Sequence, residues 1–474
     1  MVTPLRLALW LPVILAPLAA CDTGSSGDDC AQYALYDCSG ACRDLNGDPY
    51  NCGQCGVVCP AGLVCSLGAC AAACDPSLTQ CGASCADLAS NFYHCGTCEV
   101  GCAENTTCVQ GACNGVGAGT GGTPGSDGVG GTPGFGGTSN LGGAPTAPQG
   151  TWLAPVSPQA QSILQAEYAF WKDRYFTDCG DGTGCIEDIR VNTCNSEGVG
   201  YGMLLAAGMD DRDLFDRLWG YYLAHRNGDG VMHWETNACG SVTGQNGASD
   251  ADLDAAMALH QADAKWGGYS AQASTLVSAI RTYETETCSG RIILRPGDTW
   301  GGCSNTNRVN PSYFSPGYYR VFATYYSSQS ANWMQMITDT YTLWGSYQSS
   351  MNGLICDWAN LNSGCESAEF GYEAVRAPWR AATDYAWSGD ASAAQVLQRI
   401  SNYVDQANGI ANVPFEPNSA FRGSLALSGM VRGQAVFDTY VSDWLASVSD
   451  TQYYSGTLRA LFLMFAAGQF PSTF

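Results

Sequence analysis

Charged residues are scarce in this chain of 474 residues, and lysine is nearly absent. Asp, Glu, Lys and Arg make up 13% of the chain, and its only lysines are Lys172 and Lys265. Because apolar residues reach 46%, the composition excludes a chain kept disordered by charge and predicts one to three domains with a sizeable core. Twenty basic against 43 acidic residues give a net charge of −23, which excludes nucleic acid as a partner, since its phosphates would be repelled.

Long apolar runs are also missing, apart from one at the N-terminus. Residues 1–20 carry Arg6 and then an apolar stretch, a pattern typical of a secretory signal. This stretch is too short and too interrupted by proline to span a bilayer, and no other segment is long enough. It ends Leu18-Ala19-Ala20-Cys21, which resembles the lipobox of bacterial lipoproteins. The resemblance implies a lipid on Cys21 as the mature N-terminus, and the alternative is ordinary cleavage.

Cysteine is abundant and concentrated in one region. With Cys21 set aside, 24 of the 25 cysteines remain, and 16 of these lie between residues 30 and 113. They form two sets of eight: Cys30, Cys38, Cys42, Cys52, Cys55, Cys59, Cys65 and Cys70, then Cys74, Cys81, Cys85, Cys95, Cys98, Cys102, Cys108 and Cys113. From the second cysteine of each set the steps are identical at 4, 10, 3, 4, 6 and 5 residues, which predicts two tandem repeats, at about 30–70 and 74–113.

These repeats have too few large apolar residues to be held together by burial, so they need disulfides or a metal. The Cys-x2-Cys pairs would suit zinc, but an exported chain meets an oxidising environment and the only histidine nearby is His94. We therefore expect four disulfides in each repeat, with a pairing that the spacing leaves open. The region has no constellation of acid, base or nucleophile, and its role as a protease-resistant spacer or as an adhesive module stays open.

A change of composition separates this region from the rest of the chain. Residues 115–150 contain 15 glycines and 4 prolines, which predicts a flexible linker that cannot repay the entropy of ordering. Twelve of the thirteen tryptophans lie at Trp152 or beyond. The sequence therefore predicts a signal at 1–20, the Cys-rich region at 21–114, the linker at 115–150 and a large globular domain at 151–474.

Helical periodicity dominates the large domain, and strand-like alternation is scarce. Helices are predicted at 197–209, around Leu214 and Leu218, and at 250–266, 376–387, 393–404 and 457–467. Arg291–Leu294 is one of the few strand-like pieces, and long loops rich in Gly, Asn and Asp occupy 226–250 and 295–312. Helices joined by long loops favour a helical toroid that holds a cleft, and they do not favour a compact bundle.

Acidic residues stand at the beginning of two of these helices. Ser196 and Glu197 precede several glycines, small residues that would let a ligand approach closely, and Ser249 precedes three acids within 250–254. Both segments also fit plain helix-end chemistry, in which a serine caps the helix and acids favour the positive end of its dipole. In the same way, Glu373 and Arg376 fit a solvent-exposed helix start with an ion pair three residues apart.

Taken together, motifs in a shared order resemble glycoside hydrolase family 8 over most of residues 160–474, with the Cys-rich repeats outside the resemblance. They are Ser196-Glu197-Gly198 with Tyr201-Gly202-Met203, His233-Trp234, Ala248-Ser249-Asp250-Ala251-Asp252 continuing to Trp266, Pro296-Gly297-Asp298-Thr299-Trp300, Asn310-Pro311-Ser312-Tyr313-Phe314, and Ala377-Pro378-Trp379-Arg380 through Asp384-Tyr385. The resemblance implies a mainly α fold, an (α/α)6 barrel, and hydrolysis of β-1,4-linked glycans with inversion.

The resemblance also implies roles for individual residues. Glu197 would be the general acid, and Asp250 would hold the distorted sugar in the central subsite. Residues that would contact sugar rings are Trp234, Trp300, Tyr313, Tyr372, Arg376, Tyr453 and Tyr454. Aromatic walls and carboxylates suit sugars, which offer apolar C–H faces and many hydroxyls. The resemblance implies no metal and no cofactor.

One position departs from the family pattern. The usual catalytic base is the Asp of a Tyr-Asp-Ala-x-Arg segment, which here reads Tyr372-Glu373-Ala374-Val375-Arg376. Glu is one methylene longer, so three hypotheses stay open. Glu373 serves as the base with a shifted backbone, another acid serves, or the domain binds glycan without cutting it, as a surface lectin on a hydrolase scaffold would.

The substrate and the location follow from the same features. Cellulose and mixed-linkage β-glucan are the expected substrates of an endo-acting enzyme, and xylan and chitosan are the alternatives. The chain is expected to act as a monomer, held to the bacterial cell envelope or surface by the lipid on Cys21 or released outside the cell. Its eight remaining cysteines should all be paired, and Cys288–Cys303 and Cys356–Cys365 would each close a short loop.

Overall fold

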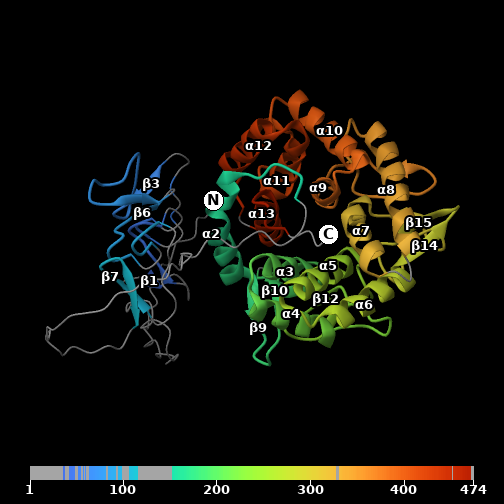
Figure 1. Ribbon diagram of the computed structural model, residues 1–474, viewed down its shortest axis with the longest axis horizontal. Coiled ribbons are helices and arrows are strands. Elements are labelled where there is room, and N and C mark those ends of the chain that lie inside the picture. The colour runs from blue at the N-terminus through green and yellow to red at the C-terminus, as the bar shows by residue number, and fades with distance from the viewer. Residues whose placement is uncertain are drawn as a thin grey trace, which may run out of the picture. The chain divides into compact units, whose positions relative to one another are not determined.

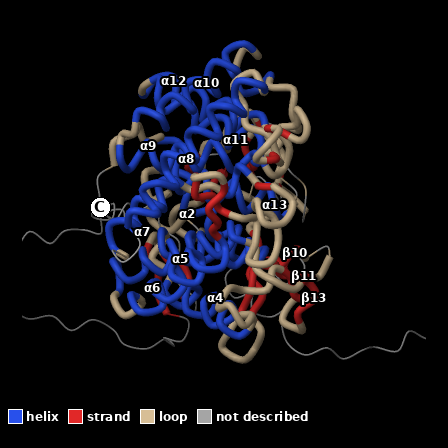
Figure 2. The backbone as a smooth tube through the Cα atoms, turned by 90° about the vertical axis from the view of Figure 1, so that its right-hand side faces the viewer, coloured by secondary structure: helices blue, strands red, loops and turns tan. Residues whose placement is uncertain are grey.

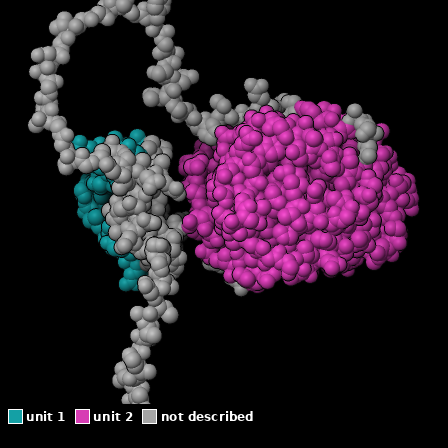
Figure 3. All heavy atoms as spheres, turned by 90° about the horizontal axis from the view of Figure 1, so that it is seen from below, with its two compact units in different colours: residues 1–136 teal, residues 137–474 magenta. Residues whose placement is uncertain are grey.

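The computed structural model describes residues 152–470, apart from 190, 327–329 and 451. In the N-terminal part it describes residues 36–37, 42–48, 52–54, 57, 59, 63–81, 84–91, 94–98 and 106–115. The predicted signal, Cys21 and residues 116–150 of the predicted linker lie outside these ranges. The chain divides into two compact units, residues 1–136 and 137–474 (Figure 3). None of the helices within the described ranges has the length and apolar composition needed to cross a bilayer.

Short hairpins make up the described residues of the first unit. The strands are β1 (Tyr36–Asp37), β2 (Cys42–Arg43), β3 (Val64–Ser66), β4 (Ala69–Ala71), β5 (Thr79–Cys81), β6 (Ser84–Ala86), β7 (Thr106–Val109) and β8 (Ala112–Gly115). One sheet has the order β4-β3-β6-β5, with β3 and β6 parallel. Equivalent backbone contacts recur in both halves of the unit: Gly53 donates to the Leu45 carbonyl, and Gly96 donates to the Leu88 carbonyl.

Disulfides account for most of what is buried in this unit. The described pairs are Cys52–Cys65, Cys59–Cys70, Cys74–Cys85, Cys81–Cys98 and Cys95–Cys108. The buried clusters consist of half-cystines, such as Cys52 with Cys65 and Cys95 with Cys108. Closing a loop of about 15 residues stabilises a fold by about 3 kcal/mol in the chain-entropy account, so these bridges take the place of an apolar core.

The second unit is an (α/α)6 barrel, as the resemblance implied, in which inner and outer helices alternate (Figure 1). The inner helices are α3 (Ser196–Gly208), α5 (Ser249–Trp266), α7 (Pro316–Tyr325), α9 (Ala377–Ser388), α11 (Ser419–Ala426) and α13 (Tyr453–Ala466). The outer helices are α2 (Pro158–Tyr175), α4 (Arg212–Ala224), α6 (Ser270–Ala279), α8 (Ser330–Ser350), α10 (Ala391–Gln406) and α12 (Gln434–Ser447). Each outer helix packs on an inner neighbour, and α2 packs on α13 and closes the ring.

Side-chain size explains which helices are inside. The outer helix α2 buries a single stripe, formed by Ala160, Leu164, Tyr168, Trp171 and Tyr175 at helical spacing. The inner helix α3 is buried around almost its whole circumference and is rich in Gly and Ala. A Cβ on its Gly200 would lie 2.9 Å from the carbonyl oxygen of Ala251 in α5, so α3 can approach α5 this closely only without a side chain there.

The predicted helices are present, but the predicted serine caps are wrong. The Asn195 side chain caps α3, accepting the Gly198 N–H at 2.7 Å, because the chain enters α3 directly from a strand that ends at Asn195. Ser249 lies inside the first turn of α5, where its hydroxyl donates to the Arg295 carbonyl at 2.5 Å. Both serines are buried and help to join the helix starts to their surroundings.

Short strands and single turns connect the helices. The five strands β9 (Phe176–Asp178), β10 (Gly184–Asp188), β11 (Thr193–Asn195), β12 (Glu235–Thr236) and β13 (Val242–Gly244) form one antiparallel sheet, in which β10, β11 and β13 group at one side in Figure 2. The others are the hairpin β14 (Thr285–Cys288) and β15 (Arg291–Leu294), which confirms the predicted strand, and the sheet β16 (Arg308–Val309), β17 (Ala359–Asn360) and β18 (Gly364–Cys365). The turns are η1 (Ile280–Glu284), a π-helix, and the 3-10 helices η2 (Pro311–Tyr313), η4 (Ala374–Arg376), η5 (Ile410–Asn412) and η6 (Leu427–Arg432).

All eight cysteines of the barrel are paired. The bridges are Cys179–Cys239, Cys185–Cys194, Cys288–Cys303 and Cys356–Cys365. The two pairs predicted from loop length, Cys288–Cys303 and Cys356–Cys365, are therefore confirmed. The other two fasten the β9–β13 sheet, which leads into α3.

Candidate active site

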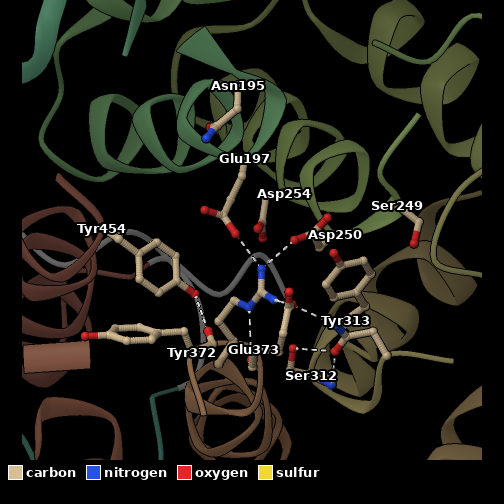
Figure 4. A network of polar contacts seen from close by, with 12 residues as sticks. Asn195, Glu197, Ser249, Asp250, Asp254, Ser312, Tyr313, Tyr372, Glu373 and Tyr454 are labelled. Atoms are coloured by element: carbon tan, nitrogen blue, oxygen red, sulfur yellow. Dashed lines mark hydrogen bonds and ion pairs between the residues drawn. The ribbon is translucent and has the colours of Figure 1, made fainter. Parts of the chain in front are cut away.

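A single buried guanidinium joins three carboxylates at one end of the barrel (Figure 4). Nη1 of Arg376 lies 2.5 Å from Glu197 Oε2 and 2.6 Å from Asp250 Oδ2. Nη2 of the same side chain pairs with Glu373. Arg376 is only 2% exposed, so the hypothesis of a solvent-exposed helix start at Glu373 and Arg376 is wrong, although their ion pair exists. The reason is that η4 lies inside the ring and not on its surface.

The site forms where the inner helices begin. Glu197 and Asp250 lie in the first turns of α3 and α5, and Arg376 directly precedes α9. Tyr454 lies in the first turn of α13, and its hydroxyl donates to the Tyr372 carbonyl at 2.9 Å. Since helix N-termini carry partial positive charge, this end of the barrel favours groups that are negative or become negative.

Glu197 occupies a place where a carboxyl group prefers to keep its proton. Its side chain is 19% exposed, so one part remains open to a ligand. Burial raises the pKa of Glu197 to about 8, the positive charge of Arg376 opposes this, and the negative charges of Asp250 and Glu373 add to it. A carboxyl group that is protonated at neutral pH is the group a general acid requires.

Asp250 is more deeply buried and keeps a free acceptor. Burial raises the pKa of Asp250 to about 6, against the lowering effect of Arg376. Its Oδ1 atom is buried and accepts no hydrogen bond from any described residue. A buried acceptor without a partner is costly, so this oxygen is suited to a ligand hydroxyl.

Glu373 is the most open of the three acids, with a third of its side-chain surface exposed. Besides the pairing with Arg376, its Oε2 accepts the side-chain N–H of Asn310 at 2.7 Å. The backbone around it is held by Asp357, whose Oδ1 accepts the N–H groups of Gly371 at 2.7 Å and Ala374 at 2.8 Å. The carboxylate of Glu373 is therefore fixed from two sides while part of its surface faces solvent.

A second buried ion pair lies next to the first. Arg380 of α9 grips both oxygens of Asp254 in α5, at 2.5 and 2.7 Å, and both side chains are fully buried. The sequence motifs contained Asp254 and Arg380, but their contact was not foreseen, since 126 residues separate them. This pair ties α5 to α9 behind the carboxylates.

The glycines after Glu197 do not open a path for a ligand, contrary to expectation. A Cβ on Gly198 would lie 2.4 Å from the hydroxyl of Tyr453, and Gly200 faces α5. The Tyr453 hydroxyl donates to Asn195 at 3.2 Å, and Tyr453 is itself buried. These glycines therefore serve the close packing of α3, and Tyr453 braces the start of that helix.

Two of the predicted aromatic residues lie close against glycines. Trp234 is 44% exposed, and a Cβ on Gly244 would fall 2.3 Å from its ring. Trp300 has the same relation to Gly297, where a Cβ would lie 2.6 Å from the indole nitrogen. A side chain at either glycine would collide with the indole, so the glycines permit these ring positions, and indole rings suit the C–H faces of sugars.

The remaining predicted residues also gather around Arg376. The guanidinium carbon of Arg376 lies 4.9 Å from the ring centre of Tyr313. Tyr372 is exposed, and its hydroxyl donates to Glu416 at 2.6 Å and accepts from Asn418 at 3.0 Å. Ring contacts extend the wall from Tyr313 to Trp358, at 6.4 Å between ring centres, and from Trp358 to Trp300, at 5.7 Å.

Sequence reasoning missed several members of this site. Asp357, Trp358 and Asn418 lie outside the motifs that carry the family resemblance. Asn310 lies in one of them, but no role was predicted for it. The Asp357-Trp358 pair, an acid beside an aromatic residue in a Cys-flanked loop, is a signal that could have been noticed. Asp384, which was quoted as part of a motif, is fully buried between Arg320 and Tyr341, two turns further along α9, where it has a structural role.

The described residues contain three groups of side chains spaced closely enough to share a metal ion. They are Cys52, Cys59 and Cys70; Cys179, Cys185 and Cys239; and Glu286, Cys288 and Cys303. Every cysteine among them is disulfide-bonded and has no thiolate to offer. The carboxylates around Arg376 instead comprise Glu197 with its raised pKa, the partly exposed Glu373 and the unpartnered Oδ1 of Asp250.

Comparisons with known proteins match the unit that contains this site. A sequence model of the family described as Glycosyl hydrolases family 8 matches residues 151–468. Endoglucanase A of Acetivibrio thermocellus is 33% identical over 345 residues, covering 66% of this chain and 71% of that protein. The exo-oligoxylanase Rex8A of Paenibacillus barcinonensis, which releases reducing-end xylose, is 29% identical over 188 residues, covering 34% and 47%. The apo structure of a β-1,3-1,4-glucanase from Paenibacillus sp. X4 superposes with a TM-score of 0.60 at 24% identity, over 69% of this chain and 99% of that one.

Proposed function

Because the chain belongs to glycosyl hydrolases family 8 and is a glycoside hydrolase, we propose that it cleaves β-1,4-linked glucan within the chain, by inversion, with cellulose or mixed-linkage β-glucan as substrate. The endoglucanases among its relatives, at about a third identity, support the choice of glucan. The observation that carries the proposal is the guanidinium of Arg376, which holds Glu197, Asp250 and Glu373 together between aromatic walls.

In the proposed mechanism, Glu197 donates a proton to the glycosidic oxygen as the bond to the anomeric carbon breaks. Its raised pKa keeps the carboxyl protonated at neutral pH. Glu197 and Glu373 bind different nitrogens of Arg376, so the guanidinium keeps the two carboxyl groups apart. Inverting hydrolases need roughly 6.5–9.5 Å between the two carboxyl groups to admit the attacking water, and the proposed mechanism requires that separation here.

Glu373 acts as the base in this proposal, taking a proton from the water that attacks the opposite face of the sugar. Arg376 pairs with its carboxylate, and Asn310 donates a hydrogen bond to the same carboxylate. Its exposed side gives water access, and Glu373 directly precedes η4.

Asp250 and the aromatic residues hold the substrate. The unpartnered Oδ1 of Asp250 accepts a hydroxyl of the sugar in the central subsite. Trp234 and Trp300, each close against a glycine, stack on neighbouring sugar rings. Tyr313, Tyr372 and Tyr454 line the path between them.

The proposal is tested by turnover on a panel of glucan, xylan and chitosan with four proteins. Glu197→Gln and Glu373→Gln should each lower kcat by about 10²–10⁴-fold while glycan binding in affinity gels is kept. Glu373→Asp, which shortens the side chain to the family length, should retain turnover. Proton NMR of the first products should show the α-anomer. A Glu373→Gln variant with near-normal rates would remove Glu373 from the base role, and a first-formed β-anomer would contradict inversion.

Xylan remains a second candidate substrate because Rex8A, a relative, releases xylose. Glucose differs from xylose by its C6 hydroxymethyl group, and the panel separates the two directly. A kcat/KM on xylan above that on all glucans would replace glucan by xylan without changing the proposed roles of the acids.

We also propose that the enzyme is exported and tethered by a lipid on Cys21, with the paired Cys-rich repeats and the Gly-rich segment between the anchor and the barrel. The pattern Leu18-Ala19-Ala20-Cys21 and the disulfides support an oxidising, extracytoplasmic location. Mass spectrometry of the mature N-terminus is the test. An acylated Cys21 is expected, and a mature chain that begins at another residue without lipid would overturn the anchor.

A further inference from the structure

The loop closed by Cys356–Cys365 carries two neighbouring side chains that point to two different parts of the site. Asp357 accepts the backbone N–H groups of Gly371 and Ala374, which flank Glu373 on either side. Trp358 packs against Trp300 and Tyr313. The roles proposed above assign nothing to Asp357 or Trp358, yet both contact residues that those roles depend on.

A single carboxylate oxygen of Asp357 accepts both hydrogen bonds from the segment around Glu373. Oδ1 of Asp357 lies 2.7 Å from the Gly371 nitrogen and 2.8 Å from the Ala374 nitrogen. A Cβ on Gly371 would lie 2.3 Å from Oδ2 of Asp357, so the absence of a side chain at Gly371 is what permits this approach. Burial raises the pKa of Asp357, and the hydrogen bonds from the backbone of Ala374 and Gly371 act in the opposite direction.

The loop that carries Asp357 is itself anchored at several points. Its ends are joined by the disulfide Cys356–Cys365, and Ala359 and Asn360 pair with β16 and β18. Arg308 of β16 lies over the Trp358 ring, with its guanidinium carbon 4.1 Å from the ring centre, and pairs with Glu366 at 2.9 Å. The Asp357 N–H donates to the Glu369 carbonyl at 3.0 Å. Asp357 is therefore a fixed point relative to the aromatic wall.

We propose that Asp357 is a positioning residue for the catalytic base: it fixes the backbone on both sides of Glu373 and sets the distance of that carboxylate from the aromatic wall that holds the sugar. This inference rests on the proposed role of Glu373. It explains how a glutamate works where the family pattern has aspartate. A longer side chain has one more rotatable bond, so the backbone under it must be held more firmly to keep the carboxylate in place.

The first test compares Asp357→Ala with a matched control. Removing the carboxylate frees both N–H groups and lets Glu373 drift, and a misplacement of about 1 Å costs about 10²-fold in rate. We expect kcat to fall by about 10²-fold with KM little changed, because the aromatic wall is kept. The control is Asp263→Ala. In the native chain, an Asp263 oxygen likewise accepts two backbone N–H groups, those of Tyr269 at 2.8 Å and Ser270 at 2.9 Å, in the turn after α5. This control should keep its kcat.

A second measurement separates the base from the acid. In a dinitrophenyl β-cellobioside, the dinitrophenolate leaves without help from a general acid. The attack of water on this substrate still needs the base. The activated substrate should therefore restore much of the rate of Glu197→Gln and none of the rate of Asp357→Ala or Glu373→Gln. A loss caused only by poor folding would not follow this pattern.

Two further variants keep the test sharp if Asp357→Ala folds poorly. Asp357→Asn keeps an oxygen that can accept both N–H groups and should retain near-normal kcat. Gly371→Ala leaves Asp357 intact but pushes the two segments apart, and it should lower kcat as Asp357→Ala does.

The outcomes distinguish the inference from the function on which it rests. If Glu373→Gln is inactive but Asp357→Ala and Gly371→Ala both turn over normally, the positioning role is wrong and the base role stands. If Glu373→Gln turns over normally, both are overturned, because Asp357 would have no base to position. If Asp263→Ala loses as much kcat as Asp357→Ala, the effect is a general one on stability, and the positioning role is again wrong.

Discussion

At the scale of single residues, the chemistry of the site is decided by burial acting on charge. Glu197 and Asp250 both touch Arg376, which alone would lower their pKa values, yet burial outweighs the ion pairs and raises both. Glu373, on the other nitrogen of the guanidinium, is a third exposed. One arginine can thus hold one acid ready to donate a proton and another acid in contact with water.

The raised pKa of Glu197 predicts the pH dependence of the reaction. Because Glu197 must be protonated to act and burial raises its pKa to about 8, kcat/KM on glucan should fall as pH rises through about 8. With the dinitrophenyl substrate this alkaline fall should disappear, since no acid is needed. Rate profiles between pH 5 and 10 check this, and an alkaline fall of equal size on both substrates would assign it to another group.

The same shift has a sign for stability. The folded chain holds the Glu197 proton more tightly than the unfolded chain, whose pKa is near 4.5. The stabilising contribution of Glu197 is therefore complete when the pH is below the pKa of the group in the unfolded chain. It is lost as pH rises through about 8, the pKa in the folded chain.

A second prediction at this scale concerns the buried pair Asp254–Arg380. Asp254→Ala leaves Arg380 charged, buried and alone, which should cost about 3–5 kcal/mol of unfolding free energy. Asp213→Ala, which breaks the exposed pair with Arg217, should cost less than about 1 kcal/mol. Urea unfolding measures both. Arg380→Met combined with Asp254→Leu should recover most of the loss, and a cost of Asp254→Ala below that of the exposed control would show that the pair is not what joins α5 to α9.

At the scale of helices, close approach decides which helix lies inside the ring. α3 and α5 touch where Gly200 faces the Ala251 carbonyl. By contrast, a Cβ on Gly345 in the outer helix α8 would have no atom within 4 Å apart from the adjoining backbone of its own helix. The same substitution should therefore have opposite effects at the two positions.

Gly200→Ala should destabilise the barrel by about 1–3 kcal/mol, because the added methyl group forces α3 away from α5. Gly345→Ala should stabilise it by about 0.4–1 kcal/mol, because alanine restricts the unfolded chain and meets no clash. Calorimetry and urea unfolding of the two variants measure the difference. Equal destabilisation of both would mean that helix packing is not the cause.

At the scale of the whole molecule, the barrel closes through its own two ends. Trp152 packs edge-on against Phe465, with 5.0 Å between ring centres, and the Leu153 N–H donates to the Ala386 carbonyl at 2.8 Å. Ser157 caps α2, which packs on α13. The ring is therefore closed by contacts between the segment that starts at Trp152 and the last helix, α13.

A fragment of residues 152–474 should accordingly fold alone, keep the full kcat and show no free thiol when it is unfolded without reductant, since its eight cysteines form four bridges. A fragment that starts after Ser157 should lose stability, because the ring closure is cut. Thiol titration, calorimetry and turnover test the two fragments. Insolubility of the longer one would show that the Cys-rich region is needed for the barrel.

Local sequence determined the helices, two of the disulfides that close short loops, and the identity of the acids Glu197, Asp250 and Glu373, because hydrophobic period, loop length and motif order act over few residues. Its errors were local as well: the serine caps and the glycines after Glu197 depend on what packs against them. Only the closed ring decided that Arg376 joins acids 179 and 126 residues away, and that Asp357 holds the segment of Glu373. The reason is that a pairing between distant segments depends on how all the inner helices pack, and no single segment contains that information.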